Sequence, residues 1–161
     1  MSDHDRPLSK RGRHAANLVA AYLRRVKIVP DLVICSTAKR AQQTLGPITK
    51  VKKPPKVVLE REIYGGGQRA LWEQLRNLPD SAKSVILIGH NPALHDFALA
   101  LVDENSNKLL PPIGRKFPTG AMASFRFYGA WTALEPHSAA LASYITPKAI
   151  AFKRTRLSAL I

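Results

Sequence analysis

The stretch Ser84-Val85-Ile86-Leu87-Ile88-Gly89-His90-Asn91-Pro92 decides the fold class. Its first part is a short apolar run, which is typical of a strand buried on both faces. Gly89 and Pro92 then indicate a turn, and Pro suits the first turn of a helix. The helix expected next carries an apolar face made by Leu94, Phe97, Ala98 and Leu101. A buried strand that leads directly into a helix predicts an α/β sheet.

The same order of strand, polar turn and helix occurs nearer the start of the chain. Leu32–Cys35 is a second apolar run, and a helix is expected from Ala38 to about Leu45. Before them, apolar residues from Ala15 to Val26 recur at helical spacing, with Ser9 as the expected N-cap. This alternation predicts three layers, in which helices cover both faces of a mostly parallel sheet.

The remaining segments give further expectations for single elements. Lys50–Lys56 and Lys108–Lys116 are expected to be loops, and the tail from Lys148 gives no firm expectation. We expect strands at Val57–Leu59, Met122–Phe127 and Trp131–Leu134, a short helix at Leu71–Leu78 and a weakly indicated helix at Ser138–Ile145.

Length and composition limit the class of protein. The chain has 161 residues, of which 45% are apolar, enough for a single folded domain. Its 25 basic and 11 acidic residues give a net charge of +14, so an anionic partner is expected: a phosphorylated substrate, nucleic acid or a membrane surface. No run of about 18 apolar residues is present, which argues against a membrane-spanning helix.

The N-terminal residues and the single cysteine indicate the cellular compartment of the protein. Met1–Asp5 does not resemble the start of a signal peptide, because no apolar stretch follows it. The single cysteine, Cys35, excludes an internal disulfide and a metal site built from cysteines. A reducing cytoplasm is therefore the expected compartment.

Two polar loops follow predicted strands, and both lead into predicted helices. They are Ser36–Arg40 and Gly89–Pro92. Ligands of α/β sheets bind beyond the carboxyl ends of strands, and helix N-termini favour anions. His90 can donate a hydrogen bond to a phosphoryl oxygen, and Arg40 can bind one as a bidentate fork. A loop histidine that caps its turn and a solvated arginine are the alternatives.

Other charged residues have weaker claims to a site. Arg6 stands before the first helix and is either part of the same pocket or solvated. Glu60 and Glu62 follow a strand and are proton-donor candidates, although such groups are usually on the surface. The remaining histidines show no ligand spacing, so no metal site is expected. The basic loop Lys50–Lys56 lacks the interleaved aromatic residues typical of a nucleic-acid surface.

Together these loops resemble the histidine phosphatase superfamily, in its small phosphohistidine phosphatase branch (the SixA-like proteins). Any one piece of the resemblance is weak, but the ordered set is specific. The resemblance implies a phosphoglycerate mutase-like α/β/α fold and a single domain over residues 1–161. The matching pieces are Asp5-Arg6-Pro7-Leu8-Ser9 with Arg11-Gly12, Pro30–Thr44, Glu62-Ile63-Tyr64, Val85–Pro92, Lys116–Ala121 and Pro147–Ile150.

The resemblance also implies a mechanism and a set of site residues. A histidine attacks phosphorus, and water then hydrolyses the phosphohistidine enzyme, without a metal or other cofactor. By position, Arg6 and Arg40 would bind the phosphate and His90 would be the second histidine. The possible pocket residues are Ser36, Thr119 and Glu62. The expected partner is a phosphorylated protein or small phosphorylated molecule, with no specific nucleic acid and no membrane; oligomeric state is not predicted.

One departure from the family pattern concerns the nucleophile. In the superfamily it lies in an R-H-G or R-H-A-K-S motif at the end of a first strand, about a dozen residues before the segment matched by Asp5. Only Met1–His4 precede that segment here. Arg13-His14-Ala15 has similar letters but falls inside the first predicted helix, where His14 should face solvent. We therefore expect an N-terminally incomplete domain that lacks the first strand and the nucleophile.

Three explanations of this departure stay open: a start codon assigned too late, a decayed gene, or a phosphate-binding pseudoenzyme. The first is favoured, because the other pocket positions hold matching residues. Three functions correspond to these observations: a phosphatase, a catalytically dead binder of phosphorylated ligands, and a basic nucleic-acid-binding protein. Loss of a central strand would leave sheet edges unpaired, so the chain is expected to be marginally stable.

Overall fold

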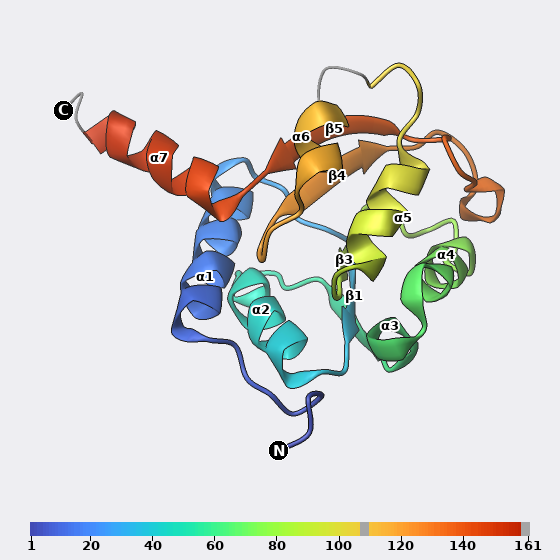
Figure 1. The fold of residues 1–161 in the computed structure, drawn as a ribbon. Coiled ribbons are helices and arrows are strands. Elements are labelled where there is room, and N and C mark those ends of the chain that lie inside the picture. Colours follow the sequence, from blue (N-terminus) through green and yellow to red (C-terminus); the bar gives the residue numbers. More distant parts are fainter. Residues whose placement is uncertain (107–109, 159–161) are drawn as a thin grey trace.

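Two short β-sheets lie between two layers of helices (Figure 1). The structure is a computed structural model that describes residues 1–106 and 110–158. One sheet is parallel with the strand order β2-β1-β3, and the other is the antiparallel pair β4-β5. The elements are α1 (Lys10–Arg25), β1 (Leu32–Ser36), α2 (Lys39–Thr49), β2 (Lys56–Glu60), α3 (Glu62–Gly65), α4 (Gly67–Arg76), β3 (Val85–Ile88), α5 (Ala93–Leu101), α6 (Leu110–Arg115), β4 (Met122–Arg126), the 3-10 turn η1 (Trp131–Ala133), β5 (Ala140–Ile145) and α7 (Pro147–Ser158).

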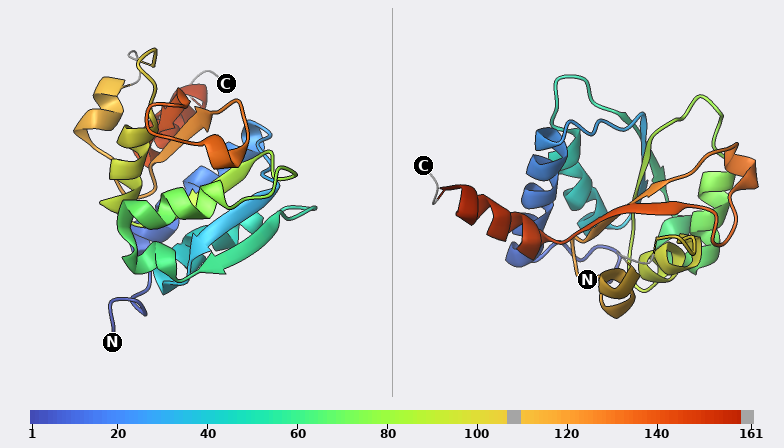
Figure 2. Two further views of the ribbon diagram at one scale, coloured as in Figure 1. Left: turned by 90° about the vertical axis from the view of Figure 1, so that its right-hand side faces the viewer. Right: turned by 90° about the horizontal axis from the view of Figure 1, so that it is seen from above.

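Helices cover both faces of the parallel sheet. Figure 2 shows α1 and α2 on one side of the strands, with α4 and α5 on the other. Leu23 of α1 packs with Val33 of β1 on the first side, and Leu71 of α4 packs with Ile34 of β1 on the second. Successive residues of a strand point to opposite faces, so β1 contributes to both cores. The predicted three-layer α/β fold is confirmed.

The central strand of the parallel sheet is β1. All five of its residues are buried, as expected for a continuous apolar run between two helix layers. In β3, by contrast, only Ile88 is buried and Val85–Leu87 are half-buried. The two strands pair in parallel, with Cys35 opposite Ile88, so their carboxyl ends lie next to each other.

The segment before α1 is fixed by side-chain hydrogen bonds. The backbone N–H of Gly12 donates to the hydroxyl of Ser9 over 3.0 Å, which confirms Ser9 as the N-cap of α1. The N–H of Leu8 donates to Oε1 of Gln43 over 2.7 Å. Because Gln43 belongs to α2, this bond holds the N-terminal segment against the helix that follows β1.

Two element predictions are wrong. Residues 138–145 are not helical: Ala140–Ile145 forms β5, which pairs with β4. The predicted strand Trp131–Leu134 is instead the short 3-10 turn η1. Here the indole N–H of Trp131 donates to the carbonyl of Ala82 over 2.7 Å. The partner strand of β4 is supplied by β5, so tertiary pairing overrides the local pattern.

Smaller differences concern predicted loops and element ends. The expected end of α2 at about Leu45 is too early, because the helix continues to Thr49. The short helix α6 lies within Lys108–Lys116, which is expected to be a loop and of which residues 108 and 109 lie outside the described residues. The short helix α3 has no counterpart among the elements expected from the sequence. Within the described part of the chain, no helix is long and apolar enough to cross a bilayer.

Candidate active site

The carboxyl ends of β1 and β3 bring Ser36 and His90 together. Ser36 is fully buried, and its Oγ lies 2.8 Å from Nε2 of half-buried His90. The N–H of Ala38 donates to the same Oγ over 3.2 Å, so Ser36 also shapes the turn into α2. This pair lies where ligands of parallel sheets bind. Two residues that were predicted separately from the sequence are therefore in contact.

Arg40 extends from the first turn of α2 and binds the N-terminal segment. Its Nη1 donates to the backbone carbonyl of Asp3 over 2.7 Å, and its Nη2 lies 3.1 Å from Oδ2 of the same residue. Nη2 of Arg6 lies 3.2 Å from the other carboxylate oxygen of Asp3. The side chain of Arg40 is 21% exposed and that of Arg6 is 64% exposed. Both oxygens of one carboxylate are thus held by guanidinium groups.

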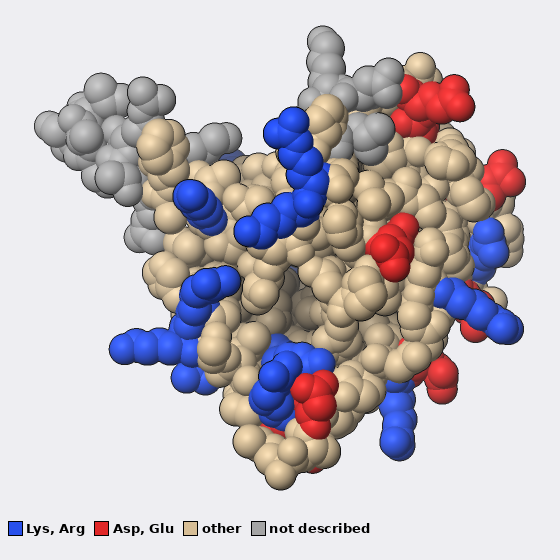
Figure 3. All heavy atoms as spheres, viewed as in Figure 1, with Lys and Arg blue, Asp and Glu red and all other residues tan. Residues whose placement is uncertain are grey.

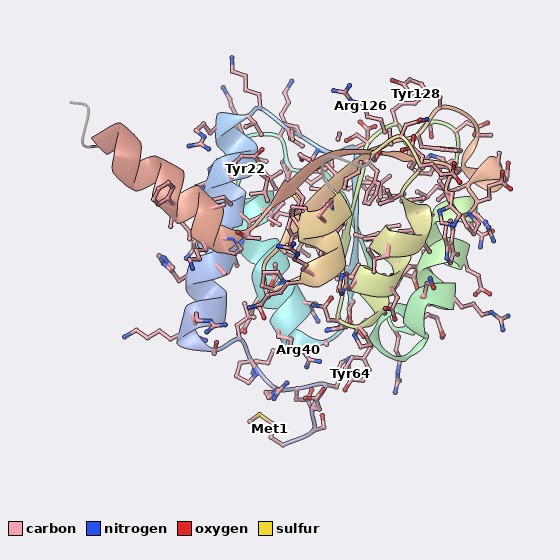
Figure 4. All side chains as sticks on the ribbon, turned by 45° about the horizontal axis from the view of Figure 1, so that its top comes forward. Met1, Tyr22, Arg40, Tyr64, Arg126 and Tyr128 are labelled. Atoms are coloured by element: carbon pink, nitrogen blue, oxygen red, sulfur yellow. The ribbon has the colours of Figure 1, made fainter. Side chains whose placement is uncertain are left out.

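Tyr64 of α3 links this ion-pair cluster to His90. Its hydroxyl donates to Oδ2 of Asp3 over 3.0 Å, and the guanidinium of Arg40 lies 5.7 Å from its ring centroid. The same ring meets the ring of His90 edge-on at 5.5 Å. Figure 4 shows Arg40 and Tyr64 on one side of the molecule, next to the N-terminal segment that begins at Met1. Sequence reasoning quoted Tyr64 in a matched motif but did not name it as a site residue.

His4 also belongs to this region and was missed from the sequence. Its Nε2 lies 3.0 Å from Oγ1 of Thr37, and its carbonyl accepts a hydrogen bond from the N–H of Lys39. Nδ1 of His4 lies 3.7 Å from a carboxylate oxygen of Asp5, and its ring meets Tyr64 edge-on at 4.9 Å. No spacing pattern marks His4, because its contacts depend on how the N-terminal segment folds back onto α2.

Burial, a hydrogen bond and neighbouring charges shift three pKa values in the site. Burial lowers the pKa of His90, and the positive charge of Arg40 lowers it further. The hydrogen bond from Tyr64 lowers the pKa of Asp3, and the two arginines act in the same direction. The same hydrogen bond raises the pKa of Tyr64. The site therefore holds a neutral histidine beside an ionised carboxylate and two guanidinium groups.

Several predicted or conceivable site residues lie elsewhere. Thr119 is exposed in the turn before β4. Two residues earlier, the carbonyl of Phe117 accepts a 2.7 Å hydrogen bond from the side chain of Asn91, the residue after His90. Glu62 is exposed at the start of α3, and its carboxylate has no hydrogen-bond or ion-pair partner among the described residues. His14 is exposed on α1, as the sequence predicts.

The described side chains of this region are not arranged for metal binding or for thiol chemistry. Among residues 1–106 and 110–158, no group of three or more His, Cys, Asp or Glu side chains is placed to hold a metal ion. Burial raises the pKa of the Cys35 thiol to about 12, which keeps it protonated and unreactive. At the ends of β1 and β3, Arg40, Arg6 and Tyr64 instead contact one carboxylate, an arrangement of donors that is suited to an anion.

The sequence model of the histidine phosphatase superfamily (branch 1) matches residues 1–94. The chain belongs to the histidine phosphatase superfamily. The matched part contains Arg6, Arg40 and His90 together with β1 and β3. An uncharacterised protein of Mycobacterium tuberculosis is 33% identical to this histidine phosphatase family member over 150 residues, 92% of this chain and 93% of that protein. One of Mycobacterium leprae is 30% identical over 149 residues, covering 92% and 91%.

Solved structures of SixA proteins have the same fold. A protein assigned as a phosphohistidine phosphatase SixA from Nakamurella multipartitia superposes with a TM-score of 0.81 at 30% identity, covering 91% of this chain and 88% of that one. A SixA complexed with tungstate superposes with a TM-score of 0.72 at 24% identity, over 91% and 88%. The fold of this family member is thus phosphoglycerate mutase-like, and its family is one of phosphatases.

Proposed function

We propose that this chain binds a phosphoryl group at Arg6, Arg40 and His90 and acts on phosphohistidine or a related small phosphorylated substrate. The observation that carries the proposal is the binding of the Asp3 carboxylate by both arginines and Tyr64, beside His90. A carboxylate and a phosphoryl group present similar oxygens to a guanidinium fork. The Asp3 carboxylate therefore indicates where phosphoryl oxygens would lie.

Each proposed binding residue has a distinct electrostatic role. Arg40 is mostly buried and held by its ring contact with Tyr64, so it is positioned before ligand arrives. His90 is held by Ser36 and becomes a stronger donor when a bound anion favours its protonated form. Fixed donors of this kind stabilise the charge that develops on phosphoryl oxygens during transfer. Ser36 thus supports the site through His90, whereas exposed Thr119 and Glu62 are assigned no direct contact with the phosphoryl group.

The proposed reaction passes through a phosphohistidine enzyme. A histidine nitrogen attacks phosphorus and forms an N–P bond, while the bond to the leaving group breaks and the leaving group takes up a proton. Water then attacks phosphorus, the N–P bond breaks, and inorganic phosphate leaves. We assign this nucleophile to no residue of the printed chain, because its single R-H-A triplet, Arg13-His14-Ala15, lies on α1 with His14 exposed.

That placement of His14 favours a second candidate function: a phosphate-binding protein without turnover. Such a protein would use the same residues, Arg6, Arg40 and His90, and would hold a phosphorylated protein rather than hydrolyse it. The third function weighed from the sequence, nucleic-acid binding, gains no specific support, since the basic loop around Lys52 and Lys53 is merely exposed.

Binding and turnover measured on the same samples separate the two candidates. Tungstate is the binding probe, followed by isothermal titration, and a histidine-phosphorylated protein is the substrate, followed by phosphate release. We expect Arg40→Gln and His90→Gln to weaken tungstate binding about tenfold or more, the loss typical of a charge-assisted bond. Arg69→Gln is the matched control, because Arg69 is exposed and, among the described residues, its ion-pair partner is Glu73.

The outcomes are distinct. Phosphate release that is lost in His90→Gln supports the phosphatase. Tungstate binding that depends on Arg40, without phosphate release, supports the binder. A folded protein that neither binds tungstate nor releases phosphate, or in which Arg69→Gln has the same effect as Arg40→Gln, contradicts both proposals.

A further inference from the structure

The charge of the chain is divided unevenly between its two helix layers. From Arg6 to Leu59, the stretch that holds α1 and α2, the sequence has 13 basic residues and one acidic residue, Asp31. From Glu60 to Glu104, the stretch that holds α4 and α5, it has four basic and seven acidic residues. Figure 3 shows acidic side chains over α5 and none over α1. The helix layer of α1 and α2 is therefore cationic and has almost no acidic groups of its own.

A pocket of about 210 Å³ lies in this cationic layer, between the segments that follow α1 and α2. It is at the amino ends of the parallel strands, because these segments lead into β1 and β2, where Leu32 is paired with Lys56. The anion site is at the carboxyl end of β1, about 17 Å away along a strand of five residues. We call this pocket the basal pocket. Its apolar lining includes Leu23, Ile28, Val29, Ile48, Val51 and Pro55.

Seven basic side chains lie on the segments that form the basal pocket, and all seven are exposed. The segment Arg24–Lys27 supplies three of them and Lys50–Lys56 supplies four. None of the seven belongs to an ion pair among the described residues. The nearby carboxylate of Asp31 instead accepts the backbone N–H groups of Lys83 and Ser84, at 2.8 and 3.0 Å. The charge of these cations is therefore left to solvent ions or to an anionic partner.

Apolar side chains are exposed at the same place. Val26 and Ile28 are exposed, and Val29 retains 60% of its exposure. Ile28 and Val29 also line the basal pocket. Exposed apolar groups around a hollow are typical of sites of protein interaction. The apolar hollow and its cations together define a complementary partner, which carries acidic groups on both sides of one large apolar side chain.

Lys27 has an unusual backbone conformation beside the pocket. Its φ is 57°, in the left-handed region that favours glycine. The N–H of Lys27 donates to the carbonyl of Arg24 over 3.2 Å, and the N–H of Ile28 donates to the carbonyl of Leu23 over 3.0 Å. Helices that end with this pair of bonds usually have glycine at the position of Lys27. Lysine therefore costs conformational energy here, and its charged side chain belongs to the lining of the basal pocket.

We propose that the basal pocket docks an acidic peptide segment of a partner protein, with one large apolar side chain in the pocket and carboxylates on the surrounding cations. At about 210 Å³ the pocket is smaller than the sites of drug-sized ligands and suits a single side chain such as Phe. An apolar anchor in a pocket commonly dominates the binding energy of an interface. Because the anion site lies at the other end of β1, the proposal does not depend on phosphatase activity.

Other anionic partners fit these observations less well. A bilayer offers no single group that enters a hollow. The lining, which lies wholly within the described residues, includes no aromatic side chain on which a nucleic-acid base could stack. A second copy of the chain carries the same net charge of +14, so the two copies repel each other.

A pair of labelled peptides tests the proposal. The probe has a central Phe with four Asp or Glu residues on each side, and the control has Ala in place of the Phe. Fluorescence anisotropy gives both affinities. We expect one probe to bind per chain, and the control to bind about tenfold more weakly because it lacks the buried apolar group. Added salt should weaken both peptides and keep the ratio of their affinities, because salt screens charges but not apolar burial.

Two double variants with the same change in net charge locate the peptide. Lys52→Gln with Lys53→Gln removes two exposed cations beside the basal pocket. Arg61→Gln with Arg69→Gln removes two exposed cations at the start of α3 and on α4. We expect the first pair to weaken the binding of the probe about fivefold at low ionic strength, and the second pair to leave it unchanged. Excess tungstate at constant ionic strength should not displace the probe from either protein.

Lys27→Gly separates a role in binding from a role in folding. Glycine relieves the left-handed backbone, so the midpoint of urea denaturation should stay the same or rise. The lost cation should weaken the binding of the probe about threefold. An unchanged affinity, or a loss of affinity that only accompanies a lower midpoint, would contradict the proposal.

Other outcomes would also overturn it. Equal affinities of probe and control, or equal effects of the two double variants, would show unselective attraction between opposite charges. Displacement of the probe by tungstate would place it at the anion site. A folded protein that binds phosphatidylserine vesicles or a single-stranded oligonucleotide but not the probe would assign this surface to another class of partner. A dimer, detected by analytical ultracentrifugation, that excludes the probe would assign it to a second copy of the chain.

Discussion

At the scale of single residues, Asp3 is the internal counterion of Arg6 and Arg40. An external anion must displace this carboxylate before it meets both guanidinium groups. We expect Asp3→Asn to strengthen the binding of inorganic phosphate about tenfold, because the competing charge is removed while the arginines stay. Isothermal titration at constant ionic strength measures the change.

The control for this prediction is Asp5→Asn. It removes the same unit of charge two residues away, but Asp5 contacts Ser2 and His4 rather than the arginines. Its effect on phosphate affinity should be small. Equal effects of the two substitutions would show that net charge, and not displacement of the Asp3 carboxylate, controls anion affinity.

His90 gives anion binding a pH dependence. Burial and the charge of Arg40 lower its pKa below the ordinary value of 6.5, so the free site is neutral at this position near pH 7. A bound anion favours the charged imidazolium and raises this pKa, so binding takes up a proton. We expect sulfate, which does not titrate in this range, to bind more tightly as the pH falls from about 8 to about 6.

Two variants assign the titration. His90→Gln should flatten the pH profile of sulfate binding, whereas His14→Gln, which removes an exposed histidine on α1, should leave its shape unchanged. The heat of binding in buffers of different ionisation enthalpy counts the protons taken up. A pH profile that keeps its shape in His90→Gln would contradict the assignment of the proton to His90.

The site residues differ in how far the sequence reveals them. Ser36, Arg40 and His90 belong to the two polar loops that follow predicted strands, and a parallel sheet brings such loops to one edge. Asp3, His4 and Tyr64 carry no such signal. Their contacts depend on how the segment before α1 folds and on the short helix α3. Neither of these two segments has an amphipathic repeat from which its structure could be predicted.

At the scale of elements, the turn from β3 into α5 depends on the absence of a side chain at Gly89. A Cβ atom there would lie 2.9 Å from Cγ2 of Ile63, which is almost fully buried. Because Ile63 packs in the core, relieving this overlap displaces packed atoms, and we expect Gly89→Ala to lower the free energy of unfolding by about 1–3 kcal/mol. Urea denaturation followed by circular dichroism gives the value.

Gly65→Ala is the comparison with the opposite sign. Gly65 is the exposed last residue of α3, and apart from its chain neighbours and the helix backbone an added Cβ would meet no atom within 4 Å. Alanine is the better helix former, so this variant should raise the free energy of unfolding by up to about 1 kcal/mol. If both variants destabilise the protein equally, the close approach at Gly89 is not the cause.

The elements predicted correctly are those whose own residues repeat strongly. The apolar faces of α1 and α5 and the continuous runs of β1 and β3 determine their type locally. Ala140–Ile145 lacks such a repeat and becomes a strand because β4 is beside it. Trp131 has strand-forming neighbours but is held in a 3-10 turn by its bond to Ala82. Long-range partners decide these cases, and one sequence does not reveal them.

At the scale of the whole molecule, two sheets rather than one lie between the helix layers, and a mainly apolar cavity of about 500 Å³ lies between β3 and β4. Apolar surface that lines such a cavity should bind an uncharged apolar dye in the native state. We expect Nile red to bind at neutral pH with enhanced emission, and Ala123→Trp to reduce the signal, because Ala123 lines the cavity. Dye binding that appears only when the protein is partly unfolded by acid would contradict this view of the native state.

The contacts that close the anion site join distant parts of the chain. His4 meets Thr37, Ser36 meets His90 and Asp3 meets Tyr64, across separations of 33, 54 and 61 residues. Contacts of such long range carry a loop-closure cost and form slowly during folding. Local elements such as α1 can therefore appear early in refolding without creating any anion affinity. The rate at which refolding protein gains that affinity reports the completion of its topology, not the formation of its helices.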